Sequence, residues 1–124
     1  MRAHVTEDNQ GRRHVAEPCM EPCAIERGMR VLGGKWTGSI LWHLKDEPVR
    51  FNDLARMING ASKKMITERL RHLEAHGLIR REVMATAPVS VQYSITPHGE
   101  TALGVLDALR GWVEEDRLED RPDT

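Results

Sequence analysis

The sequence predicts a mainly helical α+β domain, in which short helices are followed by a two-stranded hairpin and a closing helix. Apolar residues recur at a spacing of about 3.6 residues up to His76, which is the period of an amphipathic helix. Between Leu78 and Ile95 the spacing changes to two, which is the period of a strand. Thr96 and Pro97 then supply the cap and the first-turn proline of another helix. The 124 residues are enough for one domain with a single modest core.

Three short helices are predicted in the first half of the chain. The first runs from about Ala24 to Leu32 and the second from about Trp36 to Leu44, and the helix-breaking pair Gly33-Gly34 separates them. A third helix begins near Asn52, whose side chain suits a helix cap. The apolar residues of this third helix are Leu54, Met57 and Ile58.

The fourth predicted helix, residues 62–76, has the clearest start and stop signals in the chain. The hydroxyl of Ser62 can accept a hydrogen bond from an orphan backbone N–H, and Gly77 can adopt the left-handed conformation that ends a helix. The apolar stripe of this helix consists of Ile66, Leu70 and Leu73.

A short turn, Asn59-Gly60-Ala61, joins the third and fourth helices. Two helices joined by a short turn that contains glycine form a helix-turn-helix. The outer face of the fourth helix carries Lys64, Thr67, Glu68 and Arg71, and a helix with such a face fits the major groove of DNA. An ordinary solvent-exposed amphipathic helix has the same pattern, so the neighbouring segments decide between these two interpretations.

The period of two predicts strands over residues 78–83 and 89–95, with Ala85-Thr86-Ala87-Pro88 as the tip between them. A hairpin directly after a helix-turn-helix is a wing, here spanning about residues 79–95. The closing helix carries a long apolar seam for a chain end, which either covers the core of the domain or pairs with a second copy. Its members are Leu103, Leu106, Leu109, Trp112 and Val113.

Charge is unevenly distributed along a chain whose formal net charge is −1. The segment from Ser62 to Glu82 contains six basic and three acidic residues, whereas acidic residues predominate from Glu100 onward. Because phosphate repels acidic groups, the C-terminal end should lie away from bound DNA. We expect a flexible N-terminal arm over residues 1–18, a folded domain over 19–116 and an acidic tail over 117–124.

Several classes of protein are disfavoured by the sequence. No apolar run reaches the roughly 18 residues that a membrane span requires, and residues 1–17 lack the apolar part of a signal peptide. We therefore expect a cytoplasmic protein without a membrane partner. An enzyme is also disfavoured, since the chain has no glycine-rich phosphate loop and no paired carboxylates in an apolar setting. No cofactor is predicted.

A series of short motifs follows along the chain: Cys23, Gly33-Gly34-Lys35-Trp36-Thr37, Arg50-Phe51-Asn52-Asp53-Leu54, Ser62-Lys63-Lys64-Met65-Ile66-Thr67, Arg69-Leu70, Leu73-Glu74, Gly77-Leu78, Tyr93-Ser94-Ile95-Thr96-Pro97-His98-Gly99, Leu106-Asp107-Ala108-Leu109 and Trp112. Each motif is weak alone, but their joint order and spacing are specific. By these motifs the chain resembles the HxlR family of bacterial winged-helix regulators, over about residues 23–112.

This resemblance implies a transcriptional regulator that binds a palindromic operator as a homodimer, with dimer contacts from the first and last helices. The implied interface residues are Ile25, Leu103, Leu106, Leu109 and Trp112. Two segments depart from the family pattern. Pro88-Val89-Ser90-Val91 replaces a Pro-Pro-Arg-Val run and so lacks a basic wing residue, and Asn59-Gly60-Ala61 replaces the commoner Pro-Gly-Ile.

The residues expected to contact DNA are basic or polar. Lys and Arg bind phosphates or guanine edges, Glu accepts a hydrogen bond from cytosine, and Thr contacts the thymine methyl. The predicted DNA-binding residues are Lys35, Arg50, Ser62, Lys63, Lys64, Thr67, Glu68, Arg71 and Gln92. A winged helix used only for protein contacts is an alternative, which the basic residues of the fourth helix disfavour.

A signal is expected to act through Cys23, with Cys19 as a second thiol. Cys23 lies at the predicted N-terminus of the first helix, where the thiolate, the reactive form of cysteine, is favoured. Some relatives use a cysteine at this position to sense oxidants or electrophiles. The alternatives are a thiol without a signalling role and a small-molecule effector between the dimer helices. A zinc site from His14, Cys19 and Cys23 has loose spacing and lacks a fourth ligand, so no metal is predicted.

Overall fold

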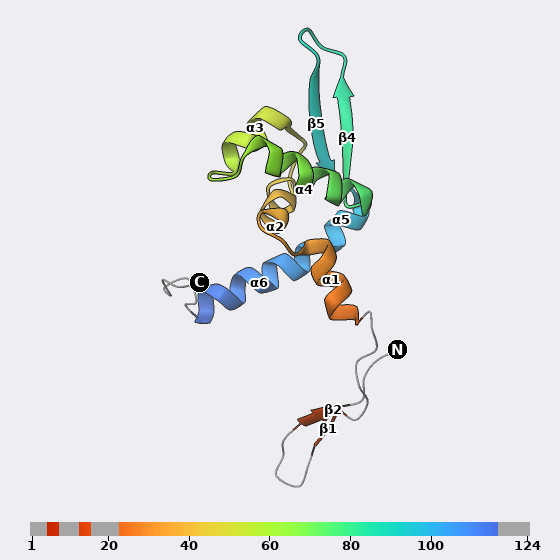
Figure 1. The fold of residues 1–124 in the computed structure, drawn as a ribbon, viewed down its shortest axis with the longest axis vertical. Coiled ribbons are helices and arrows are strands. Elements are labelled where there is room, and N and C mark those ends of the chain that lie inside the picture. Colours follow the sequence, from red (N-terminus) through yellow and green to blue (C-terminus); the bar gives the residue numbers. More distant parts are fainter. Residues whose placement is uncertain (1–4, 8–12, 16–22, 117–124) are drawn as a thin grey trace.

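The structure is a computed structural model that describes residues 5–7, 13–15 and 23–116 (Figure 1). Most helices and strands follow one another in pairs along the chain, and the wing projects from one end of the helical body. In chain order, the elements are β1 Val5–Glu7, β2 Arg13–Val15, α1 Ala24–Leu32, α2 Thr37–His43, β3 Val49–Arg50, α3 Phe51–Met57, α4 Lys63–Ala75, β4 Ile79–Met84, β5 Ser90–Ile95, α5 Pro97–Thr101 and α6 Leu103–Asp116.

The core lies where α2, α3 and α4 meet the base of the sheet. The apolar stripe predicted for the fourth helix is confirmed, since Ile66, Leu70 and Leu73 are completely buried. From α2, Ile40 and Leu41 are equally inaccessible to solvent. Because these short helices share one core, the orientation of α4 depends on all of its neighbours.

Both predicted ends of α4 are confirmed. The Ser62 hydroxyl accepts a hydrogen bond from the backbone N–H of Met65 at 3.1 Å, which satisfies one of the orphan donors at the helix start. At the other end, Gly77 has a φ of 74°, a left-handed conformation that few residues other than glycine adopt easily. The α3–α4 pair therefore forms the predicted helix-turn-helix.

The predicted wing is also confirmed, as an antiparallel pair of β4 and β5 in which Ile79 lies opposite Ile95. The sequence does not predict β3, which pairs antiparallel with β5 and gives the sheet order β3-β5-β4. Two residues are too few to show a strand period. The sequence also does not predict β1 and β2, which pair antiparallel within the expected N-terminal arm.

Two predicted helix boundaries were wrong. The third helix begins at Phe51, and its N-cap is Arg50, two residues before the predicted cap Asn52, because β3 runs directly into the helix. The closing helix is divided at Ala102 into α5 and α6, of which α5 contacts β5 and α6 contacts α2. None of the helices in the described part of the chain has both the length and the apolar character needed to cross a membrane.

Gly99 joins the C-terminal helices to the end of α4, and we expect Gly99→Ala to destabilise the domain. A Cβ atom at this position would lie 2.1 Å from the Leu78 carbonyl oxygen, so the backbone would have to move. The expected loss is roughly 2–4 kcal/mol of unfolding free energy. The matched control is Gly104→Ala, where nothing lies within 4 Å of the added atom, and a gain of about 0.5–1 kcal/mol is expected. Urea unfolding at one protein concentration measures both, and equal stability of the two variants would contradict this assignment.

Candidate nucleic-acid interface

The solvent-facing side of α4 presents an exposed row of charged side chains. Lys63, Lys64, Glu68 and Arg71 are all exposed. Within the described residues, none of these four side chains makes a hydrogen bond or an ion pair. They are therefore available to a ligand, and their types match those that bind phosphates and base edges in a major groove.

The two hydroxyl residues predicted on the same helix already have local partners. Ser62 is the helix cap, and the Thr67 hydroxyl donates a hydrogen bond to the Lys63 carbonyl at 2.8 Å. With the Thr67 hydroxyl hydrogen engaged, the methyl group is the part of this side chain that remains for contact with a base. This fits the predicted contact of Thr67 with a thymine methyl.

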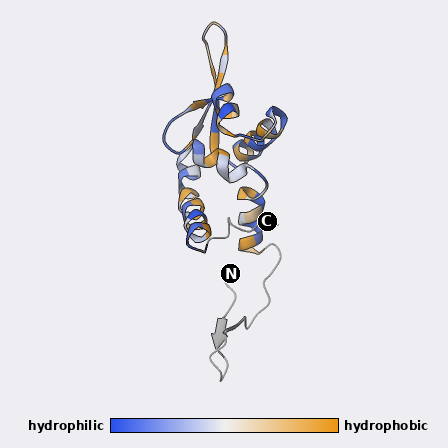
Figure 2. Cartoon of the chain, turned by 90° about the vertical axis from the view of Figure 1, so that its left-hand side faces the viewer, coloured by the Kyte–Doolittle hydropathy of each residue, from blue (hydrophilic) through white to orange (hydrophobic). Residues whose placement is uncertain are grey.

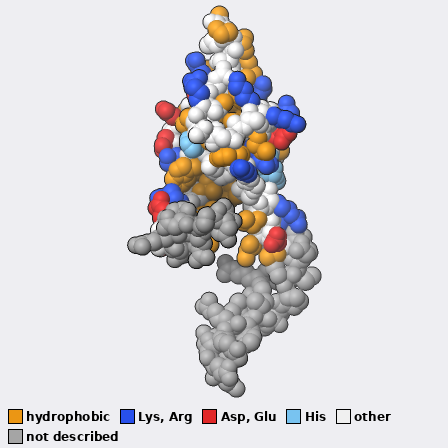
Figure 3. Space-filling view, turned by 60° about the vertical axis from the view of Figure 1, so that its left-hand side comes forward, with side chains coloured by type: hydrophobic (Ala, Val, Ile, Leu, Met, Phe, Trp, Pro, Cys, Tyr) orange, Lys and Arg blue, Asp and Glu red, His pale blue; other side chains and the backbone are white. Residues whose placement is uncertain are grey.

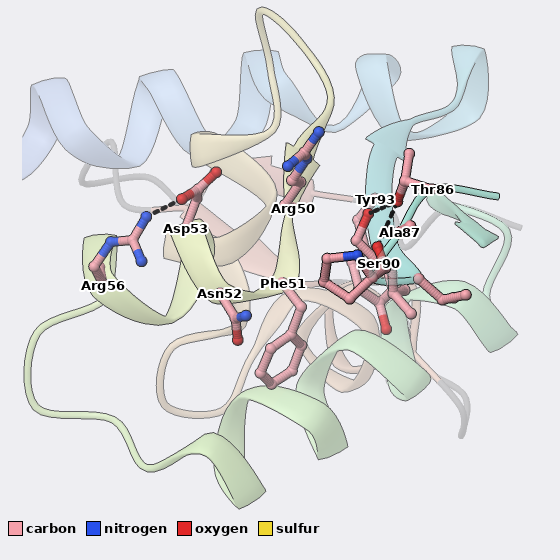
Figure 4. A pocket seen from close by; sticks show the side chains of 12 residues that line it. Arg50, Phe51, Asn52, Asp53, Arg56, Thr86, Ala87, Ser90 and Tyr93 are labelled. Atoms are coloured by element: carbon pink, nitrogen blue, oxygen red, sulfur yellow. Dashed lines mark hydrogen bonds and ion pairs between the residues drawn. The ribbon is translucent and has the colours of Figure 1, made fainter. Parts of the chain in front are cut away.

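A cleft of about 730 Å³ lies between the start of α3 and the wing (Figure 4). One wall holds Arg50, Asn52 and Arg56, and the opposite wall holds Thr86 and Ser90 from the wing. A second cleft of about 390 Å³ shares Asn52 and Arg56 and extends to Lys63. The two clefts thus connect the wing with the start of α4 along a wall that carries three cationic side chains.

Asn52 and Arg56 were not among the predicted contact residues. They lie four residues apart on the exposed side of α3, and Arg56 forms an ion pair with Asp53. The usable signal in the sequence is their polar i, i+4 spacing opposite the buried Leu54. Their position in both clefts depends on the wing, which no local pattern in α3 indicates.

Lys35 and Gln92 lie outside the exposed face of α4. The Lys35 ammonium lies 5.3 Å from the centre of the Trp36 ring, in the turn between α1 and α2. Gln92 lies opposite Arg50 on the middle strand and donates a 3.5 Å hydrogen bond to Glu82. Of the predicted contact residues Lys35, Arg50 and Gln92, only Arg50 lines the cleft beside the wing.

In the half of the molecule away from the wing, α1 and α6 carry hydrophobic residues (Figure 2). Large apolar side chains of both helices are exposed. Ile25 is 72% exposed, Leu109 53% and Trp112 55%, which is unusual for residues of this size. Leu103 and Leu106 are partly buried, and Leu106 packs against the core of its own chain. A space-filling view shows several Lys and Arg side chains around the base of the wing, and apolar side chains both at the tip of the wing and in the half away from it (Figure 3).

A third cleft, of about 400 Å³, separates α2 from α6 and is lined mainly by apolar atoms. Trp42 lies in its wall, with the guanidinium of Arg110 6.0 Å from the ring centre. The hydrogen bond that the Arg110 guanidinium donates to Asp107, together with the nearby charge of Glu114, raises the pKa of Arg110 above its ordinary value. The positive charge of Arg110 is therefore balanced by carboxylates of its own helix.

Cys23 is the N-cap of α1 and is partly buried, which agrees with its predicted place at the start of the helix. Its backbone carbonyl accepts a 2.8 Å hydrogen bond from the N–H of Arg27. Cys19 lies outside the described residues, as does the side chain of His14. Among the described residues, no three metal-binding side chains come together.

A helix-turn-helix with an exposed basic face, followed by a wing, defines a DNA-binding transcriptional regulator of the winged-helix class. Residues 31–120 match the model of the HxlR-like helix-turn-helix family, and the chain belongs to this family. This confirms the resemblance seen in the sequence motifs. The family is one of regulators and not of enzymes.

Relatives in sequence and in structure agree with this assignment. YybR, an HTH-type transcriptional regulator of Bacillus subtilis strain 168, is 37% identical over 100 residues, which cover 81% of this chain and 80% of YybR. A solved MarR-family chain from Porphyromonas gingivalis W83 has a TM-score of 0.75 at 32% identity, covering 80% of this chain and 97% of that chain. The redox regulator HypR in its reduced form has a TM-score of 0.73 at 36% identity, covering 78% and 98%. The oxidised form of HypR gives 0.71 at 36% identity, covering 75% and 96%.

Proposed function

We propose that this chain is a cytoplasmic regulator that binds a palindromic DNA operator as a homodimer. The observation that carries the proposal is the exposed face of α4, whose four charged side chains have no partner among the described residues. With this face in the major groove, the phosphates of one DNA strand would lie along the clefts beside α3, toward the wing. The wing lacks the basic residue that is usual in the family, so Arg50 would contact phosphate on this side, and Arg56 would do so after leaving its ion pair with Asp53.

The apolar faces of α1 and α6 support the homodimer. Ile25, Leu109 and Trp112 are large and exposed. They belong to α1 and α6, which lie away from the wing. A second copy would cover them and leave the two α4 helices, the recognition helices of the dimer, on the opposite side. Exposed apolar patches of this kind mark association surfaces. The two-fold axis of such a dimer would be matched by a palindromic operator.

Cys23 is the proposed sensor of oxidants or electrophiles. It caps α1, and a helix N-terminus favours the thiolate form of a cysteine. HypR, whose fold this chain shares, is a redox regulator solved in both its reduced and its oxidised form. Oxidation by diamide would join two thiols in one disulfide, with both hydrogens transferred to diamide. The second thiol would be Cys19 of the same chain or a cysteine of the second copy.

We expect oxidation to change DNA binding by the wild-type chain but not by the Cys23→Ser variant. The measurement is a mobility-shift titration on the DNA upstream of the chain's own gene, with reduced protein and with diamide-treated protein. Cys19→Ser shows whether Cys19 is the partner of Cys23, and electrophoresis of the oxidised protein without reductant distinguishes a disulfide within one chain from one between two chains. A shift that is insensitive to diamide in every variant would reject thiol sensing while leaving DNA binding intact.

The cleft between α2 and α6 favours a second candidate for the signal. It is apolar, has a volume of about 400 Å³ and presents the Trp42 ring next to the proposed dimer helix. A small apolar molecule bound there would contact both α2 and α6, and so could alter the dimer. If diamide has no effect in the titration above, thermal-shift screening of Trp42→Ala against the wild type is the next test.

A further inference from the structure

The C-terminal end of α1 packs on the rest of the domain. Residues 24–30 are exposed, whereas Val31 and Leu32 pack against the core. A helix of nine residues is about 14 Å long. A rotation of about 10° at the Leu32 end would therefore move Cys23 by roughly 2 Å. The contacts at the Leu32 end therefore act on the direction of the helix.

Two side chains of α4 bind the main chain at this end. The Nε2–H of His72 donates to the Val31 carbonyl at 2.9 Å, and the Nε–H of Arg69 donates to the Lys35 carbonyl at 2.9 Å. Because Arg69 and His72 are three residues apart, they lie on one side of α4, between the buried stripe and the exposed face. The end of α1 is therefore tied directly to the recognition helix.

The turn between the two carbonyls is strained and closely packed against the helix-turn-helix. Gly34 and Trp36 have φ values of 91° and 76°, and such a φ is rare for tryptophan. A Cβ atom at Gly34 would lie 3.5 Å from the Arg69 guanidinium carbon, and one at Gly60 would lie 3.5 Å from the Trp36 ring. Next to them, the buried Thr37 hydroxyl has no partner among the described residues. Strained backbone persists where its surroundings enforce it, and it is frequent at functional elements.

We propose that Arg69, His72 and the turn of residues 33–36, together called the α1–α4 bracket, fix the angle between α1 and the recognition helix. This inference rests on the proposed function, because in a dimer held by α1 and α6 this angle sets the separation of the two recognition helices. Arg69 is then a positioning residue, although it is a basic residue on the recognition helix. The bracket is also the connection through which movement of Cys23 would reach α4.

The first test measures the angle without DNA. His72→Phe keeps a planar ring but removes the N–H donor, whereas His72→Gln keeps a side-chain N–H. Spin labels are attached to Glu26→Cys of α1 and Glu74→Cys of α4, in a chain that also carries Cys19→Ser and Cys23→Ser. Dilution with unlabelled protein ensures that the measured distance is the one between the two labels of a single chain. A narrow distance distribution is expected for the parent and for His72→Gln, and a broad one for His72→Phe. Arg69→Met is the substitute if His72→Phe does not fold.

The second test measures the consequence for DNA, on the site that the wild-type chain protects upstream of its own gene. Insertion of one base pair between the half-sites is expected to weaken wild-type binding about tenfold or more, because either the duplex or the protein must deform. For His72→Phe the same insertion is expected to cost less than about threefold, and His72→Gln should behave as the wild type. A change in spacing preference is not expected from a loss of stability alone.

The possible results distinguish failure of the proposed bracket from failure of the proposed DNA-binding function on which it rests. A narrow distribution in folded His72→Phe and Arg69→Met would overturn the bracket, whatever their DNA affinity. A broad distribution without a change in spacing preference would leave the bracket as the device that sets the angle, but would overturn its role in spacing. Absence of specific binding by the wild-type chain would instead reject the proposed operator binding.

Discussion

Replacing Lys64 and Arg71 together by alanine is expected to weaken specific DNA binding by at least about thirtyfold, since each lost contact to a base or phosphate costs about 1–3 kcal/mol. Both side chains are exposed on the same face of α4 and have no partner in the described part of the chain. The slope of log affinity against log salt concentration should fall by about one for each lost phosphate contact. Fluorescence anisotropy at several salt concentrations measures both effects.

The matched control removes the same charge elsewhere. Lys45→Ala with Arg110→Ala also deletes one lysine and one arginine, but both lie at the Trp42 ring, between α2 and α6. We expect this variant to keep the affinity within about threefold, because exposed charges distant from the contact are screened by salt. Equal losses in the two double variants would mean that net charge, and not the face of α4, determines binding.

Introducing glutamate at Leu109 and Trp112 together is expected to convert the proposed dimer to monomers at micromolar concentration. The two side chains are 53% and 55% exposed in one chain, and burying two carboxylates in an apolar contact is strongly unfavourable. DNA affinity should fall by about a hundredfold or more, because a monomer contacts only one half-site. Sedimentation velocity measures the association, and anisotropy measures the affinity.

Met57→Glu is the control for this second prediction. Met57 is also a large exposed apolar residue, at 45%, but it lies on α3 and not on α1 or α6. Its glutamate variant should remain a dimer. If Leu109→Glu with Trp112→Glu sediments as a dimer as well, the association surface lies elsewhere on the chain.

Features encoded by adjacent residues were predictable from the sequence. The cap at Ser62, the left-handed Gly77 and the buried stripe of α4 all follow from spacing within one helix. The wing was predictable for the same reason, since the period of two is visible within each strand. These features were enough to give the fold class and the exposed face of the recognition helix.

Features that depend on distant residues were not predictable. The backbone of Gly99 in α5 lies against the Leu78 carbonyl, a contact that no local pattern indicates. The two-residue strand β3 exists because its partner β5 is in place. The hydrogen bonds of Arg69 and His72 to main-chain carbonyls likewise depend on how α1 and α4 meet. Periodicity describes each helix or strand separately and does not indicate which elements contact one another in the fold.

The most direct test of the central claim, that this chain reads a palindromic DNA sequence as a dimer through α4, is selection of bound duplexes from a random library by the purified full chain. The enriched sequences should contain two inverted half-sites whose centres lie about 10–10.5 base pairs, or a multiple of this, apart. The variant with Lys64→Ala and Arg71→Ala should enrich nothing comparable. Failure of the wild-type chain to enrich any sequence, or equal enrichment by that variant, would contradict the account.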